Sequence, residues 1–349
     1  MPFLKADPAS AHLTPCNALL AAACKQHGLE LYLEEAFQYS GYFKTKAGTL
    51  LPFKGTSLPV NAYGAAAVAA DKGFCAELLA SQSLSTPTGI VLAPPATLRE
   101  ISNSNPQAAI KTAGFRQAEY FSAHHGFPLF IKPNDGTQGK GVYKVDEAAQ
   151  LLQRFNELAH NHPLIRLEVA ATGTDLRIIV LDGEVQAVIR RDPPFLNGDG
   201  ASSLAQLLDS FETQQQTRSG GKKISQEDNR LAAHLARSGW QLHDIPPKGA
   251  KVTLLPSANL STGGTATLIT GDLAPCHAQT AIAAAKAVGL RYAGVDLMVE
   301  DVTAQTSGAY KIIELNAGPG LVNFLSADPS HARIISQIYN KICSSLKGL

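Results

Sequence analysis

The chain has 349 residues, of which 45% are hydrophobic and 17% are charged, and its formal net charge is +1. This length is too great for one small core and predicts two or three packed subdomains. The near-neutral charge argues against a general nucleic-acid binder and against a protein that binds membrane surfaces through charge.

The five cysteines are scattered and include no CxxC pair, a pattern typical of reduced thiols in a cytosolic protein. Proline, lysine and aspartate interrupt the first ten residues, so we expect no signal peptide. The longest apolar run, residues 18–24, is too short to cross a bilayer. The sequence therefore predicts a cytoplasmic protein without a nucleic-acid or membrane partner.

Residues 1–69 are expected to form a small α/β unit. An alanine- and leucine-rich stretch predicts a helix over residues 17–26 that ends near Gly28, and residues 29–33 and 49–53 are candidate strands. This segment suggests no chemistry.

Asp71 is a typical N-cap for a helix that continues to residue 80, and a strand over residues 89–92 follows. Lys72 lies in the first turn of that helix. We expect Lys72 either to be exposed to solvent or to contact a phosphate.

Residues 127–133 predict a short apolar strand that carries Lys132, and a buried lysine needs an anionic partner. The loop over residues 134–142 contains three glycines and Lys140, a composition that lets backbone N–H groups approach phosphate oxygens. A hairpin turn uses the same residues, so both interpretations stand. The loop matches neither the GxxxxGK[ST] nor the GxGxxG spacing.

A capped helix over residues 146–158 and a strand over 164–169 come next, followed by a hairpin of residues 176–181 and 185–191 that turns at Asp182-Gly183. The hairpin ends in Arg190 and Arg191, which alternation places on opposite faces. One of them points at a phosphate, or both form a surface charge pair.

Two helical patterns fill residues 201–240 around a polar link at 214–223. A second glycine-centred loop, rich in hydrogen-bonding groups, covers residues 259–265. A helix over residues 274–288 has Pro275 near its start and Gly289 at its end, as helix termini prefer.

The last two predicted strands, residues 291–299 and 310–315, carry the acidic residues of greatest interest. Glu314 and Asn316 are two residues apart and share a face, and a hairpin-like link over 300–309 brings Asp296 beside Glu314. Each carboxylate alone is equally well explained as a salt-bridged structural residue. Two that converge in an apolar sheet favour a cation, and oxygen ligands suit Mg²⁺.

These motifs, in this order, resemble the ATP-grasp superfamily. Within it they are most similar to the ATP-grasp module of cyanophycin synthetases and of bifunctional glutathione synthetases. The matching segments lie within residues 70–325 and read IKPNDGTQGKGV, RRDPPFLNGDG, NLSTGGTA, AGVDLMVED and IIELNAGPGL.

The resemblance implies an α+β protein with the ATP-grasp fold, in which two α+β subdomains grip ATP, preceded by a small α/β N-terminal domain. It places the N-terminal domain at residues 1–69 and the ATP-grasp domain at 70–349. Within the latter, residues 87–170 form the smaller nucleotide-lid subdomain and 171–349 the larger catalytic subdomain.

The activity it implies is an ATP-dependent carboxylate–amine ligase. Such an enzyme forms an amide through an acyl phosphate, releases ADP and phosphate, and acts here on an amino acid or small peptide. Its cofactors are ATP and Mg²⁺, with Mn²⁺ as an alternative metal. A homodimer is left open.

The resemblance also implies residue roles. Contacts to the nucleotide phosphates, including those from the mobile loop, are expected from Lys72, Lys132, Gly136, Gln138, Gly139 and Gly141. Lys132 is also expected to contact the adenine edge. Adenine and ribose contacts are expected from Glu168, Val169, Ala170 and Asp175. Metal ligation is expected from Asp296, Glu314 and Asn316. Stabilisation of the transferring phosphoryl group is expected from Arg190 or Arg191, with Asn259 and Lys140.

Several departures from these families affect the substrate. The Mur-ligase-like module of cyanophycin synthetases and the glutamylcysteine-forming domain of glutathione synthetases are not expected here. Gln138 stands where cyanophycin synthetases carry a histidine, and residues 322–324 lack their basic character. The sequence therefore predicts a stand-alone ligase. Its alternatives are a glutathione-synthetase-like enzyme that adds glycine to a γ-glutamyl dipeptide, and an ATP-binding scaffold or sensor without turnover.

Overall fold

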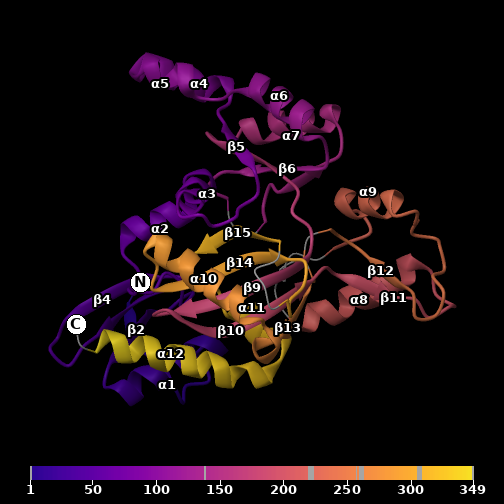
Figure 1. The fold of residues 1–349 in the computed structure, drawn as a ribbon. Helices are drawn as coiled ribbons and strands as arrows, with labels where there is room; N and C mark the ends of the chain where they lie inside the picture. The colour runs from indigo at the N-terminus through magenta and orange to yellow at the C-terminus, as the bar shows by residue number, and fades with distance from the viewer. Residues whose placement is uncertain are drawn as a thin grey trace. The chain divides into compact units, whose positions relative to one another are not determined.

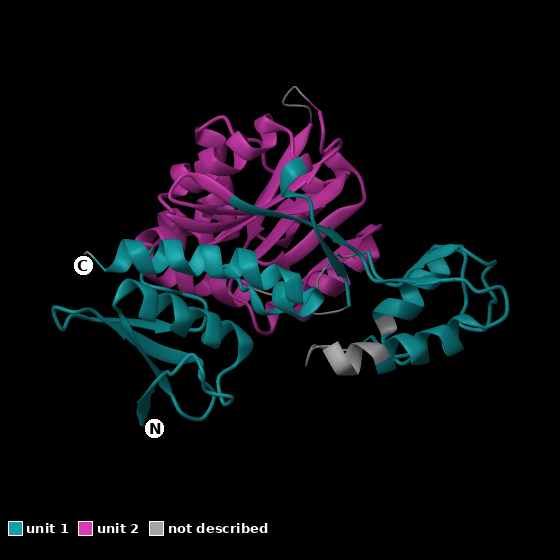
Figure 2. Cartoon of the chain, turned by 90° about the horizontal axis from the view of Figure 1, so that it is seen from below, with its two compact units in different colours: residues 1–60, 186–271, 318–349 teal, residues 61–185, 272–317 magenta. Residues whose placement is uncertain are grey.

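The computed structural model describes residues 2–136, 139–218, 224–256, 258, 263–304 and 309–347 (Figure 1). The chain divides into two compact units. Unit 1 comprises residues 1–60, 186–271 and 318–349, and unit 2 comprises residues 61–185 and 272–317 (Figure 2). Both units mix helices and strands, so the α+β class is confirmed. The predicted boundaries at residues 69 and 170 stay predictions.

Unit 1 contains an N-terminal sheet with the strand order β1-β2-β3-β4, in which every neighbouring pair is antiparallel. Its strands are β1 (Phe3–Lys5), β2 (Glu30–Glu34), β3 (Ser40–Lys44) and β4 (Leu50–Lys54). The predicted first helix is confirmed as α1 (Pro15–His27), which ends at Gly28 in the left-handed conformation. Strand β3 was not predicted.

The C-terminal part of unit 1 packs against its N-terminal part. Helix α12 (Ala332–Leu346) lies against α1, and the buried thiol sulfurs of Cys24 and Cys343 are 3.7 Å apart. The preceding elements are α11 (Val322–Ala327) and the 3-10 turn η3 (Pro329–His331). The unit therefore joins the two ends of the chain.

The middle segment of unit 1 holds a cluster of buried aliphatic residues of its own, which includes Leu204, Leu231 and Val252. Its elements are β11 (Phe195–Asn197), α8 (Leu204–Arg218), α9 (Asn229–Arg237) and β12 (Lys251–Thr253). Strands β10 (Glu184–Asp192) and β13 (Thr265–Leu268) pair in antiparallel fashion. The 3-10 turn η2 (Thr270–Asp272) follows.

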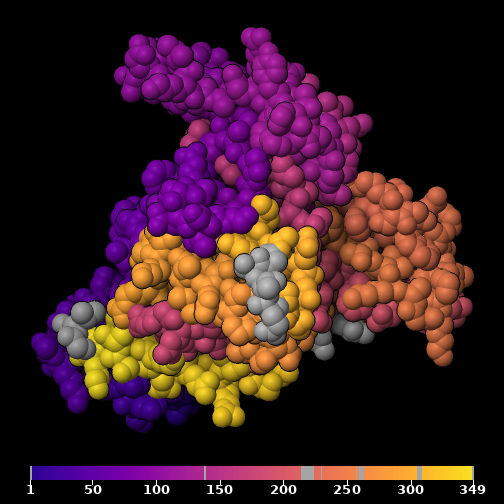
Figure 3. Space-filling view, in the orientation of Figure 1, coloured from indigo at the N-terminus to yellow at the C-terminus, as the bar shows by residue number. Residues whose placement is uncertain are grey.

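Unit 2 contains a four-stranded sheet with the order β5-β8-β6-β7. Its strands are β5 (Gly89–Leu92), β6 (Leu129–Pro133), β7 (Tyr143–Val145) and β8 (Ile165–Val169), and its helices are α4 (Pro95–Ser104), α5 (Pro106–Lys111), α6 (Phe115–His125) and α7 (Ala148–Ala159). Buried Leu129, Phe155 and Leu167 belong to its core. Helices α4 and α5 are described in full and contain no buried residue, and both lie at the surface of the protein (Figure 3).

The second part of unit 2 is a group of antiparallel strands in the order β9-β14-β15. Its elements are α2 (Tyr63–Ala70), α3 (Lys72–Ser81), β9 (Thr174–Leu181), α10 (Pro275–Val288), β14 (Tyr292–Val299) and β15 (Tyr310–Asn316). Helices α2 and α3 contact β15, and α10 contacts β9 and β14. The turn after β9 has φ of 50° at Asp182 and 78° at Gly183, as hairpin turns require.

No helix in the described part of the chain is long and apolar enough to span a bilayer.

Asn61 ties the start of β14 to the end of β15. Its side-chain amide nitrogen donates to Tyr292 O (2.7 Å) and Ala317 O (2.6 Å), and its Oδ1 accepts from the backbone N–H groups of Arg291 and Tyr292. We expect Asn61→Ala to lower the free energy of unfolding by about 2–3 kcal/mol, because partly buried backbone groups lose their partners.

Urea denaturation measures this change. Asn161→Ala, at an exposed turn position, is the matched control and should stay within about 0.5 kcal/mol of the parent protein. Equal stability of the two variants would contradict the role of Asn61.

Candidate functional site

Polar side chains gather on one face of the β9-β14-β15 strands. Asp296 is directly opposite Glu314 on β15 and Arg177 on β9, and Asn316 is opposite Gly294. Because paired residues of antiparallel strands point to the same side, these side chains share one face. The predicted proximity of Asp296 and Glu314 is therefore confirmed.

Arg177 is the residue of this face that the sequence analysis missed. Its Nε and Nη2 donate to the two carboxylate oxygens of Asp296, each at 2.7 Å, and Nη2 is 4.0 Å from Glu314 Oε1. Asp296 is 2% exposed. A buried carboxylate is stable only with such a partner. The signal was the alternation of Asp175 and Arg177 along an otherwise apolar strand.

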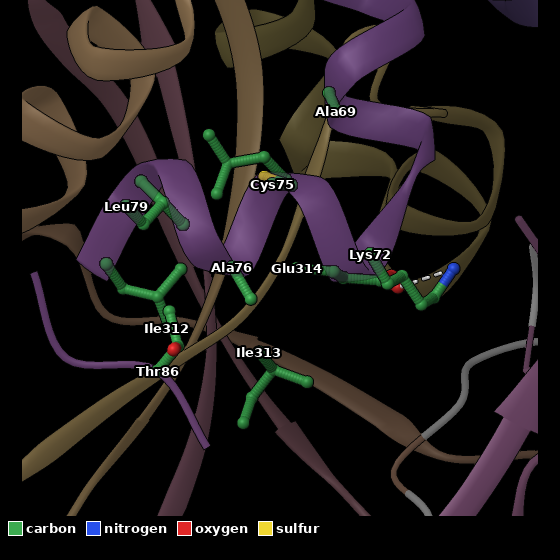
Figure 4. Close-up of a pocket in the computed structure, with 10 residues that line it drawn as sticks. Ala69, Lys72, Cys75, Ala76, Leu79, Thr86, Ile312, Ile313 and Glu314 are labelled. Atoms are coloured by element: carbon green, nitrogen blue, oxygen red, sulfur yellow. Dashed lines mark ion pairs between the residues drawn. The ribbon is translucent and has the colours of Figure 1, made fainter. Parts of the chain in front are cut away.

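Lys72 approaches the Glu314 carboxylate from helix α3. Its ammonium donates to Gly136 O and lies 3.8 Å from Glu314 Oε2, at one end of a small pocket between α3 and β15 (Figure 4). Burial lowers the pKa of Lys72, and the Glu314 carboxylate opposes that shift without cancelling it. The lysine is therefore a partly desolvated cation that faces the acidic group.

The four-stranded sheet of unit 2 carries a second charged cluster. Lys132 forms a hydrogen-bonded ion pair with Glu168, and Arg166 Nε lies 3.5 Å from the other Glu168 oxygen. All three side chains are buried. The anionic partner expected for Lys132 is thus Glu168. Two cations against one carboxylate leave a local excess of positive charge, which favours an additional anion.

The glycine-rich loop is described in part. Gly139 and Gly141 have φ of 68° and 71°, a backbone conformation that residues other than glycine rarely adopt. Lys140 is exposed. Gln138 lies outside the described residues. The loop backbone has the conformations that glycines permit, while its contact with phosphate stays a prediction.

The predicted adenine and ribose residues lie on β8, just after it, and on β9. The backbone N–H groups of Val169 and Ala170 donate to Thr88 O (2.9 Å) and Pro128 O (3.3 Å). These two donors already have protein partners. Asp175 lies on the same face of β9 as Arg177. Their roles toward a nucleotide stay predictions.

The remaining predicted residues belong to unit 1 or are not described. Arg190 Nε donates to Asp192 Oδ2 at 3.1 Å, and Arg191 takes the other face of β10 by alternation. Asn259 lies outside the described residues. Arg190 and Arg191 thus belong to a different unit from the acidic face, and their part in the site stays a prediction.

The acidic face suits a divalent cation by the chemistry of its donors. Asp296, Glu314 and Asn316 offer carboxylate and amide oxygens, and Mg²⁺ is typically held by one or two carboxylates together with phosphate oxygens and water. Arg177 and Lys72 currently neutralise the two carboxylates. Across the described ranges no group of three or more His, Cys, Asp or Glu side chains gathers for a metal, so the set of two acids and one amide is the candidate.

Comparison with known proteins gives related enzymes. The chain is 33% identical over 205 residues to a cyanophycin synthetase of Trichormus variabilis. The aligned segment is 56% of this chain and 22% of that protein. It is 30% identical over 210 residues to the glutathione biosynthesis bifunctional protein of Streptococcus agalactiae. That aligned segment is 57% of this chain and 28% of that protein. The chain thus spans less than a third of the length of these relatives. No family model matches the chain.

A solved structure shares the fold. The bifunctional glutathione synthetase from Pasteurella multocida aligns with a TM-score of 0.58 over 94% of this chain and 43% of that chain, at 19% identity. At this identity the likeness establishes the fold alone. The predicted fold, that of the ATP-grasp ligases, is confirmed.

Proposed function

We propose that this chain, which has the fold of the ATP-grasp ligases and sequence relatives among them, is an ATP-dependent carboxylate–amine ligase that forms an amide bond. It acts on an amino acid or small peptide, passes through an acyl phosphate, and releases ADP and phosphate. The observation that carries the proposal is the single strand face in unit 2 that holds Asp296, Glu314 and Asn316 against Arg177 and Lys72.

Phosphoryl transfer needs alignment and neutralised charge more than a protein nucleophile. Asp296, Glu314 and Asn316 would hold Mg²⁺, which when bound neutralises the charge of the phosphates. Lys72 and Arg177 add positive charge at the same face, and buried Lys132 adds more from the four-stranded sheet. Arg190 or Arg191, Asn259 and Lys140 are proposed to assist the transfer.

The test is a substrate-dependent release assay. Purified full-length chain with Mg-ATP is given a panel of amino acids and dipeptides, and ADP, AMP, phosphate and new amide products are measured. We expect ADP and phosphate release that requires both a carboxylate and an amine, with a product of matching mass. Release of AMP and pyrophosphate would replace the proposal with adenylation.

The same panel separates the alternatives. Turnover only with γ-glutamylcysteine and glycine would identify a glutathione-synthetase-like ligase, for which the Streptococcus agalactiae relative is the reason to include those substrates. Tight binding of Mg-ATP without turnover on any substrate would favour a scaffold or sensor. Loss of the metal ligands is one way in which a module without turnover would show itself, and Asp296, Glu314 and Asn316 are all present.

A further inference from the structure

Asn134 stands at the point where strand β6 gives way to the glycine-rich loop, and all four of its polar groups have partners. Its backbone N–H donates to Leu164 O (3.0 Å), and its backbone carbonyl accepts from Lys72 N (3.0 Å). Its Oδ1 accepts from Gly73 N (2.9 Å), and its Nδ2 donates to Asp71 Oδ1 (2.8 Å). The residue is 3% exposed. A buried amide whose oxygen and nitrogen both have protein partners favours one geometry.

Three of these four partners belong to the start of helix α3. Lys72 and Gly73 donate to Asn134, while Phe74 N donates to the capping carboxylate of Asp71 (2.8 Å). The first three amides of α3 therefore have protein acceptors and are not offered to a phosphate. Whatever α3 contributes to an anion must come from the Lys72 side chain.

Close approach of α3 to Asn134 depends on Gly73. A Cβ at this position would lie 2.2 Å from Val91 Cγ2 and 3.1 Å from Asn134 Oδ1. The backbone of α3 thus lies directly against Val91 of β5 and close to Asn134. The side chain of Lys72 also reaches the loop that follows, because its Nζ donates to Gly136 O, two residues beyond Asn134.

We propose that Asn134 is a positioning residue that sets the place of the Lys72 ammonium and links it to the glycine-rich loop. This proposal rests on the proposed function, because it assumes that Lys72 meets the nucleotide phosphates. Asn134 acts through Lys72 and the loop and does not touch the nucleotide. One buried amide thereby holds together two parts of the phosphate site that are 61 residues apart in the chain.

The decisive variants are an isosteric reversal and its repair. In the parent protein Asn134 Nδ2 donates to Asp71 Oδ1 at 2.8 Å. Asn134→Asp replaces this donor with an acceptor and places two carboxylates side by side. Asp71 Oδ1 accepts from both Asn134 Nδ2 and Phe74 N, so in the double variant Asn134→Asp/Asp71→Asn the amide introduced at position 71 has to turn. Its nitrogen can then donate to the carboxylate at position 134 while its oxygen caps Phe74, which restores one donor and one acceptor. Asn105→Asp, at the exposed N-cap of α5, is the control for the same chemical change elsewhere.

Affinity for a Mg²⁺-bound non-hydrolysable ATP analogue is measured by calorimetry. We expect Asn134→Asp to raise the dissociation constant on the order of tenfold, about 1.4 kcal/mol, and the double variant to regain most of this loss. In a Lys72→Met background the same Asn134→Asp change should alter affinity by less than about twofold, because coupled residues are not additive. Asn105→Asp should leave affinity unchanged.

Other results would overturn the proposal. An unchanged dissociation constant in a folded Asn134→Asp protein, or an equally large loss in the Lys72→Met background, would show that Asn134 does not act through Lys72. Thermal unfolding of the variants is recorded in parallel. If the swap restores stability but the parent protein binds no Mg-nucleotide, the proposed function has failed and the positioning role fails with it. If the parent binds nucleotide and the swap restores stability but not affinity, only the positioning role has failed.

Discussion

Glu314→Gln is expected to reduce ligase turnover by about 10³-fold or more, since one preorganised charged group at the reacting phosphates is lost. Glutamine keeps the volume of the side chain but removes the charge that a divalent cation requires. Glu314 faces Lys72 at 3.8 Å and Arg177 at 4.0 Å and is 28% exposed at its side chain, so the substitution leaves no deeply buried unpaired ion. The fold should therefore survive.

Turnover and its dependence on Mg²⁺ concentration check this expectation. Glu300→Gln, an exposed glutamate just after β14, is the control and should keep full activity. Full activity of Glu314→Gln would remove Glu314 from the metal site. Loss of activity together with loss of folded protein would instead identify Glu314 as a structural partner of the two cations.

Much of this site was predictable because it depends on local periodicity. Alternation places Glu314 and Asn316 on one face, and a short link between two apolar strands predicts that they pair, which brings Asp296 opposite Glu314. The glycine at the end of α1 and the aspartate at the start of α3 were likewise recognisable from chain chemistry alone. These features need no knowledge of distant contacts.

The residues that were missed depend on distant partners. Arg177 has the pattern of a solvent-facing strand residue until its partner, 119 positions away, is known. Asn134 has the composition of a turn, and its role follows only from helix α3, where Gly73 lies 61 positions earlier. Lys132 was expected to need an anionic partner, but the sequence did not show that this partner is Glu168 on the neighbouring strand. A single sequence carries no direct signal of such pairs.

The ion pair of Arg177 and Asp296 leads to the largest expected change in stability. Asp296 has a side-chain exposure of 3%, and both of its oxygens accept hydrogen bonds from Arg177. In Arg177→Met the carboxylate stays buried without this partner. We expect the free energy of unfolding to fall by about 3–5 kcal/mol, the cost of removing one partner from a buried ion pair.

The exposed pair of Arg291 and Asp182 is a matched control, because it is also bidentate, with distances of 2.7 and 3.1 Å. Its side chains are 48% and 43% exposed, so Arg291→Met should cost less than about 1 kcal/mol. Adding Asp296→Asn to Arg177→Met should recover at least half of the loss, because the buried charge is gone. Equal costs for the two arginine variants would contradict the assigned burial of Asp296.

The pH and metal dependence of Arg177→Met distinguishes a structural ion pair from a cation site. In Arg177→Met, protonation of buried Asp296 removes its charge, so lowering the pH should recover part of the stability that this variant loses relative to the parent protein. If Asp296 and Glu314 also form a metal site, millimolar Mg²⁺ should stabilise Arg177→Met more than the parent protein, since the metal then replaces the missing positive charge. Acid rescue without any Mg²⁺ effect would mean that Asp296 serves the fold alone, and the metal assignment would have to rest on Glu314 and Asn316.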